Sequence, residues 1–124
     1  THDTARILTV LGKENGQAGD RAWQSAQKLS DEEYSRGVRL LKLAAVLQFT
    51  LPGVPSVYYG DEAGMQGYGD PFCRAGYPWG KENTELLDFY KKLGTFRRSS
   101  PVFASGEFEP IYANFGDIVY IRQR

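Results

Sequence analysis

The sequence has little of what builds disulfides, metal sites and membrane spans. Its 124 residues include one cysteine, Cys73, and one histidine, His2, so no internal disulfide and no cysteine–histidine metal site can form. Fifteen basic residues balance fifteen acidic ones, and no block of one sign would attract nucleic acid or an anionic membrane. No apolar run approaches the roughly 20 residues of a membrane-spanning helix. We therefore expect a neutral partner, and neither nucleic acid nor membrane.

What is present is enough for a buried core. Hydrophobic residues make up 41% of the chain and aromatic residues 14%, as in a globular domain. The chain starts at Thr1 rather than at a methionine, and its last residues, 118–124, read as a strand without a closing turn. These ends indicate a piece of a longer protein. Cys73 has no histidine in its neighbourhood, so we interpret it as a small packing residue rather than a nucleophile.

The pattern of caps and apolar spacing predicts two long helices. Ser30 and Glu33 form a capping-box pattern, and apolar residues at helical spacing follow until Pro52, which predicts a helix over about residues 31–50. Asn83 can cap a second helix with one apolar face. Residues 4–11 suit one or two helical turns, and residues 13–28 read as a loop with room for a short helical turn.

Three other segments have the character of strands. The β-prone run at residues 55–59 lacks strict alternation, which suits a strand covered on both faces. A loop of residues 60–80, rich in glycine and aromatic residues, separates it from the second helix. Strand, loop and helix together have the layout of a βα unit, where active-site residues lie on the loop. Residues 108–112 and 117–122 are typical of an antiparallel hairpin.

The loop of residues 60–80 is the first candidate for a site. Its aromatic rings, Trp79 among them, can stack on sugar rings, while its carboxylates and Arg74 can bind sugar hydroxyls. The alternative is that the aromatic residues only pin the loop to the scaffold and the charges face water. Asp61 and Glu62 follow the predicted strand; because neighbours on a strand point opposite ways, at most one faces a site. Alternatively, they bond backbone amides of the glycine-rich loop.

His2 and Asp3 form a second candidate. A neutral donor beside a carboxylate can grip adjacent hydroxyls or stabilise positive charge that develops on an oxocarbenium-like carbon. The structural alternative is that Asp3 caps the helix that begins near Thr4. As a dipeptide, the motif leaves both interpretations open.

Four segments together resemble glycoside hydrolase family 13, the α-amylase family, and within it neopullulanases, cyclomaltodextrinases and amylopullulanases. They are Thr1–Thr4, Gly53–Met65, Asp70–Arg74 and Tyr77–Gly80, of which the second is the most specific. The resemblance implies an α/β fold, the C-terminal portion of a (β/α)8 TIM barrel from the end of strand 7 to helix 8. Residues 1–102 would belong to this barrel, and residues 103–124 would begin an antiparallel β-domain.

The resemblance also implies roles for individual residues. Asp3 corresponds to the family's third catalytic carboxylate, which stabilises the transition state, and His2 to its neighbouring substrate-binding histidine. Arg74 and Trp79 would border the substrate cleft, and Asp61 and Glu62 would shape it. Thr1 departs from the asparagine that is common before the histidine–aspartate pair.

Family members retain anomeric configuration, with a nucleophile and an acid/base on the fourth and fifth strands, and this chain contains neither strand. The resemblance therefore implies part of an enzyme that hydrolyses α-glucosidic bonds in starch, pullulan or maltodextrins. The expected partners are the α-glucan and the remainder of the barrel. We expect no cofactor in this chain, while calcium could bind elsewhere in the longer protein. Two alternatives are a non-catalytic α-glucan-binding or packing module and an unrelated small α+β interaction domain.

Overall fold

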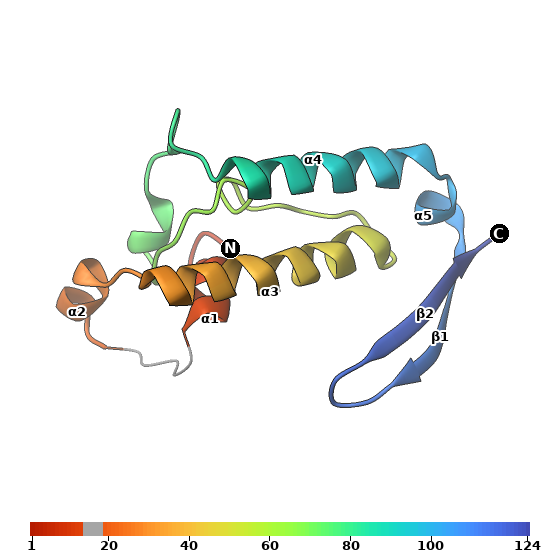
Figure 1. Cartoon of the computed structure of the whole chain (residues 1–124), viewed down its shortest axis with the longest axis horizontal. Helices are drawn as coiled ribbons and strands as arrows, with labels where there is room; N and C mark the ends of the chain where they lie inside the picture. Colours follow the sequence, from red (N-terminus) through yellow and green to blue (C-terminus); the bar gives the residue numbers. More distant parts are fainter. Residues whose placement is uncertain (14–18) are drawn as a thin grey trace.

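Two long helices dominate the computed structural model, which describes residues 1–13 and 19–124. Helices α3 (Asp31–Thr50) and α4 (Thr84–Ser99) lie side by side, and the segment of residues 51–60 returns between them (Figure 1). The short helices α1 and α2 lie at one end and a β-hairpin lies at the other. The remaining elements are α1 (Ile7–Gly12), α2 (Arg21–Ala26), the 3-10 helix η1 (Phe72–Arg74), α5 (Val102–Ser105), β1 (Glu107–Ala113) and β2 (Ile118–Gln123).

Both long helices begin at the predicted caps. The Glu33 amide donates to Ser30 Oγ at 3.2 Å, and the Ser30 amide donates to Glu33 Oε2 at 2.8 Å, which completes the capping box. The predicted bounds of 31–50 are those of α3. Asn83 Oδ1 accepts from the Leu86 amide at 3.0 Å at the start of α4. Local sequence signals therefore fix where the scaffold helices start.

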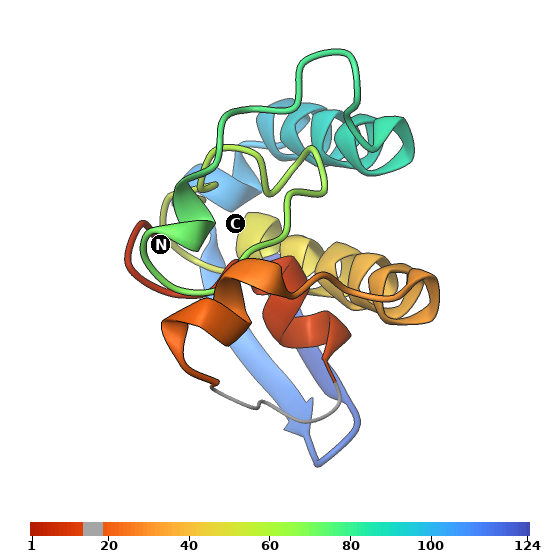
Figure 2. The same ribbon diagram turned by 90° about the vertical axis from the view of Figure 1, so that its left-hand side faces the viewer.

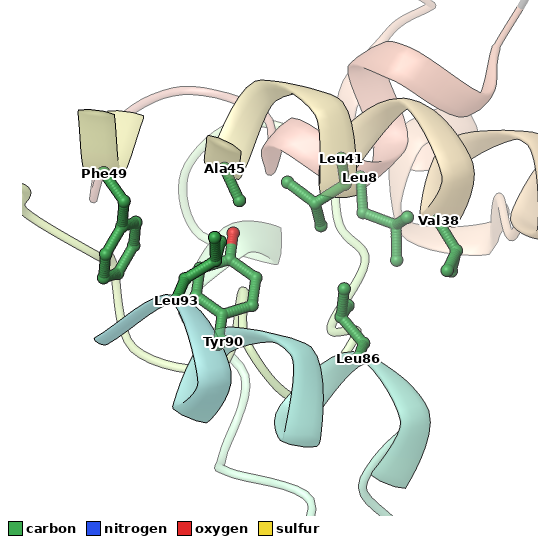
Figure 3. Packing of buried hydrophobic residues seen from close by; sticks show 8 residues of the cluster. All are labelled: Leu8, Val38, Leu41, Ala45, Phe49, Leu86, Tyr90 and Leu93. Carbon is green, nitrogen blue, oxygen red and sulfur yellow. The ribbon is translucent and has the colours of Figure 1, made fainter. Parts of the chain in front are cut away.

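The core lies where α1, α3 and α4 meet (Figure 3). Its apolar side chains come from one face of each helix, so the burial of these faces holds the three helices together. The cluster consists of Leu8, Val38, Leu41, Ala45, Phe49, Leu86, Tyr90 and Leu93.

Helix α1 lies directly on the backbone of α3 at Gly37. A Cβ atom at this position would lie 2.9 Å from the Leu8 carbonyl oxygen and 3.2 Å from the Gly12 Cα. Any side chain at Gly37 would therefore push the two helices apart. Because α1 follows the N-terminal residues directly, this contact also sets the position of His2 and Asp3.

The predicted strand over residues 55–59 is an extended segment without strand pairing. Among the residues that the structure describes, the only sheet is the two-stranded one of β1 and β2, so no strand partner lies beside this segment. A strand is defined by its partner as well as by its own residues. The segment ends in a turn at Gly60, whose φ of 85° lies in the left-handed region that favours glycine.

The predicted hairpin is confirmed. Strands β1 and β2 pair antiparallel from Glu107 opposite Gln123 to Ala113 opposite Ile118. Arg122 ties the hairpin to the helices by donating to the carbonyls of Thr50 and Val102, at 3.2 Å and 3.0 Å. Helix α5 was not expected from the sequence; it crosses the predicted boundary between residues 102 and 103, and this boundary stays a prediction.

Candidate functional site

The structure brings His2 and Asp3 into contact with Arg74, which lies 71 residues after Asp3 in the sequence. Arg74 Nη2 donates to Asp3 Oδ1 at 2.9 Å, and Arg74 Nε donates to the His2 carbonyl oxygen at 2.8 Å. His2 Nε2 lies 3.0 Å from Asp3 Oδ2. Figure 2 shows the N-terminal segment beside η1, which carries Arg74. Three of the predicted site residues therefore form one cluster, the Asp3 cluster.

The Asp3 cluster is open to solvent. The side chain of Asp3 is 63% exposed and that of Arg74 is 45% exposed. Desolvation lowers the pKa of Arg74, but the charges of Asp70, whose Oδ1 lies 3.1 Å from Arg74 Nε, and of Asp3 outweigh it and raise the pKa above its ordinary value. Arg74 is thus a permanent cation beside two carboxylates. Such a cluster can both donate to and accept from sugar hydroxyls.

The structural alternative for Asp3 is wrong. Helix α1 begins at Ile7, and its N-cap is Arg6, whose side chain makes no capping hydrogen bond. Asp3 therefore caps no helix, and its carboxylate faces the Asp3 cluster instead. Cys73 is fully buried, and its Sγ donates to the His2 carbonyl oxygen at 3.2 Å, which confirms the predicted packing role.

Asp61 pairs with Arg6 rather than with a residue of the Asp3 cluster, and this ion pair is buried. Its Oδ1 accepts from Arg6 Nη1 at 2.9 Å, and the side chains of Asp61 and Arg6 are 13% and 0% exposed. Burial raises the pKa of Asp61 above its ordinary value, and the Arg6 guanidinium opposes this only in part. This geometry favours a structural carboxylate, although its partner is an arginine rather than the loop amides that the sequence suggested.

Sequence reasoning missed Arg6. Its Nη1 also donates to the Tyr59 carbonyl oxygen at 2.6 Å, and its guanidinium carbon lies 4.6 Å and 4.8 Å from the ring centroids of Tyr58 and Tyr59. In the described part of the chain, Arg6 Nε and Nη2 are buried without a hydrogen-bond partner. The available signal was a lone arginine before the apolar run of residues 7–11, which does not reveal a partner 55 residues away.

Glu62, Tyr77 and Trp79 form a second group on the loop. Glu62 Oε2 accepts from the Gly60 amide at 2.9 Å, a bond of the kind that the structural alternative predicted. Burial raises the pKa of the Tyr77 hydroxyl, and the nearby Glu62 carboxylate, with which it shares a hydrogen bond, raises it further. The Trp79 ring packs against Tyr77, with centroids 4.5 Å apart, and is 81% exposed. Trp79 is therefore available for stacking on a sugar ring.

A cavity of about 550 Å³ lies among α3, α4 and the extended segment. Apolar and small residues of α3 form one wall. The residues with polar side chains in the lining are Thr1, His2, Gln48, Ser56, Tyr58, Asp61 and Tyr90. Burial raises the pKa of Tyr90 to about 12, and the charges of Asp61 and Glu62 add to this. Tyr90 is therefore uncharged at neutral pH.

The described residues, 1–13 and 19–124, contain no group of three or more histidine, cysteine, aspartate or glutamate side chains placed to hold a metal ion. Within the same ranges, no helix has both the length and the hydropathy that crossing a bilayer requires.

Comparison with known proteins gives one consistent result. Residues 1–92 match the family model described as the α-amylase catalytic domain. The chain is 44% identical, over its full length, to an amylopullulanase from Thermoanaerobacter thermohydrosulfuricus, of which it spans 8%. It is 46% identical over 115 residues to a cyclomaltodextrinase from Thermoanaerobacter pseudethanolicus; this match covers 91% of the chain and 16% of that enzyme. The chain thus spans a small fraction of the curated relatives it matches.

Solved structures agree with this result. A debranching enzyme from Nostoc punctiforme superposes on the whole chain with a TM-score of 0.74 and 28% identity, and the match covers 21% of that enzyme. A cyclic α-maltosyl-(1→6)-maltose hydrolase from Arthrobacter globiformis covers 99% of the chain with a TM-score of 0.73 and 30% identity, over 23% of its own length. The chain therefore belongs to the α-amylase family, glycoside hydrolase family 13, and has the fold of the C-terminal portion of its (β/α)8 catalytic barrel.

Proposed function

We propose that this chain is the C-terminal part of the catalytic barrel of a retaining α-glucan hydrolase that acts on starch, pullulan or maltodextrins. The observation that carries the proposal is the Asp3 cluster, an exposed carboxylate with a histidine at 3.0 Å and an arginine at 2.9 Å. The matching relatives support it, since they are named amylopullulanase and cyclomaltodextrinase.

In this proposal, Asp3 stabilises the transition state. Cleavage of a glycosidic bond develops positive charge on the anomeric carbon, and a fixed carboxylate nearby lowers the energy of that state. Asp3 also accepts hydrogen bonds from sugar hydroxyls, while His2 and Arg74 donate to them. Trp79 offers a stacking face at the border of the cleft, and Glu62 fixes the turn at Gly60 that begins the loop.

The nucleophile and the acid/base belong to other strands of the longer enzyme in this proposal. The two carboxylates after the extended segment are engaged elsewhere, Asp61 by Arg6 and Glu62 by the Gly60 amide. Neither is free to act as a paired acid and nucleophile. The remainder of the barrel is therefore a required partner. It would pack against the face of α3 that lines the cavity.

The test is hydrolysis of maltoheptaose and pullulan by the purified 124-residue chain, the longer enzyme and its Asp3→Asn variant. We expect no turnover by the chain alone, full activity of the longer enzyme, and a loss of about 10²- to 10³-fold in kcat for Asp3→Asn. Asp88→Asn is the matched control, because Asp88 is an equally exposed aspartate on α4, and it should leave kcat unchanged.

Two results would contradict the proposal. Turnover by the chain alone would show that its own residues supply the nucleophile and the acid. Binding of maltoheptaose by the longer protein without turnover, measured by calorimetry, would favour the alternative of a non-catalytic α-glucan-binding module.

A further inference from the structure

The Arg6–Asp61 pair joins the two segments that surround the Asp3 cluster. Arg6 follows Asp3 by three residues, and its partners Tyr59 and Asp61 lie 53 and 55 residues away, at the start of the loop that carries Arg74. The pair therefore spans from the N-terminal segment to the far end of the extended segment. One guanidinium nitrogen, Arg6 Nη1, donates to both the Asp61 carboxylate and the Tyr59 carbonyl oxygen.

Backbone hydrogen bonds continue this junction toward Asp3. The Arg6 amide donates to the Gly67 carbonyl oxygen at 2.8 Å, and the Gly67 amide donates to Thr9 Oγ1 at 2.8 Å. The Asp70 amide approaches the Asp3 carbonyl oxygen at 3.4 Å. The backbone around Asp3 is thus held against the loop at two points: the Asp3 carbonyl oxygen contacts the Asp70 amide, and the Arg6 amide contacts the Gly67 carbonyl oxygen.

The surroundings of the Arg6 side chain indicate that it fixes the positions of the two segments and does not only add stability. The guanidinium is planar and fully buried, donates through Nη1 to two oxygens, and faces two tyrosine rings, so these contacts together set its orientation. A lysine at this position would keep the charge, but it would lose the flat face that lies against the two tyrosine rings. Burying a charge in this way is unfavourable for stability compared with an apolar pair, so positioning is the better account of Arg6.

We propose that Arg6 is a positioning residue for Asp3: through its buried pair with Asp61, it fixes the segment that carries Asp3 against the loop that carries Arg74. The inference rests on the proposed function of Asp3 and adds a residue that touches no substrate. A carboxylate that stabilises a transition state acts only from a defined place, because a displacement of about 1 Å can reduce the rate by about 10²-fold.

The experiment is a double-mutant cycle in the longer enzyme with maltoheptaose as substrate. It uses Arg6→Met, Asp3→Asn and the double variant, and kcat, KM and the thermal unfolding midpoint are measured for each. We expect Arg6→Met to lower kcat by about 10- to 100-fold and to change KM by less than about twofold, because ground-state binding persists. In the Asp3→Asn background, the same change should lower kcat by less than about twofold, because the group that Arg6 positions is gone.

The control is Arg97→Met, which makes the same chemical change at a different junction. Arg97 donates to the carbonyl oxygens of Phe49 and Phe103, at 2.6 Å and 3.1 Å, and so joins α4 to the end of α3 and to α5. It should lower the thermal midpoint and leave kcat at working temperature unchanged. Where Arg6→Met fails to fold, Arg6→Lys and Asp61→Asn enter the same cycle in its place.

The outcomes separate this inference from the proposed function. If Asp3→Asn lowers kcat to a small but measurable residue and Arg6→Met has no further effect in its background, the inference is supported. If Asp3→Asn is impaired as expected but the two losses of kcat multiply in the double variant, Arg6 acts independently of Asp3 and the inference alone is overturned. If Asp3→Asn is fully active, both the proposed function and the inference are overturned.

Discussion

Two arginine–carboxylate pairs in this chain have the same length and opposite surroundings. Arg6–Asp61 and Arg74–Asp3 both measure 2.9 Å between nitrogen and oxygen. The first pair is buried, with side chains 0% and 13% exposed, whereas the second is open, with side chains 45% and 63% exposed. The distance alone therefore does not tell what each pair contributes.

The surroundings decide the contribution. A buried pair cannot lose one member without leaving a charge away from water, so it constrains the backbone on both sides. An exposed pair adds little stability, since water and ions compete with it, but its atoms stay available to a ligand. One pair therefore suits the scaffold, and the other suits recognition.

The largest expected difference concerns stability. In the longer protein, Asp61→Leu leaves the Arg6 guanidinium buried without its counter-charge and should lower the free energy of unfolding by about 3–5 kcal/mol. Asp3→Leu, the same change in the exposed pair, should lower it by less than about 1 kcal/mol. Denaturant unfolding measures both variants. Equal losses of unfolding free energy in Asp61→Leu and Asp3→Leu would contradict the distinction between the buried and the exposed pair.

Salt should separate the pairs on a smaller scale. A double-mutant cycle of Arg74→Met and Asp3→Leu should give a coupling energy of at most about 1 kcal/mol at low salt, and it should vanish near 1 M salt, where screening acts over about 3 Å. The coupling of Arg6 and Asp61 should persist, because solvent ions do not reach it. A coupling of Arg74 and Asp3 that resists salt would mean that this pair is closed to solvent in the longer protein.

The smallest effect is expected at a third pair of intermediate exposure, Lys13–Glu33. The Ser30 amide, and then Lys13, lower the pKa of Glu33 below its ordinary value of 4.5. Because the folded state holds this proton less tightly than the unfolded state, the contribution of Glu33 to stability is complete above pH 4.5 and is lost as the pH falls through the lowered pKa. The difference in thermal midpoint between Glu33→Gln and the parent should therefore be largest above pH 4.5 and should shrink as the pH falls below it. A difference that does not depend on pH would contradict this explanation.

Features set by neighbouring residues could be predicted from the sequence. The bounds of α3 follow from Ser30, Glu33 and Pro52, the start of α4 follows from Asn83, and the hairpin follows from its two β-prone runs. Each of these signals acts over a few residues, so the sequence states it directly.

Features set by distant partners could not be predicted in this way. Residues 55–59 have strand character, but pairing depends on strands that lie elsewhere in a barrel. Arg6 is buried only because Asp61 and two tyrosine rings surround it, and no local pattern encodes this environment. The resemblance to a family located Asp3 and Arg74, but their mutual contact emerged only from the structure.

The contact of α1 with Gly37 has a consequence for library design. A mutagenesis study of His2 and Asp3 would ordinarily treat Gly37, a helix residue 34 positions after Asp3, as relevant to stability alone. Because a Cβ atom at Gly37 would collide with the Leu8 carbonyl oxygen, every substitution there moves α1 and the segment before it. Position 37 therefore belongs with the positions of the Asp3 cluster when variants are chosen and when losses of the proposed activity are explained.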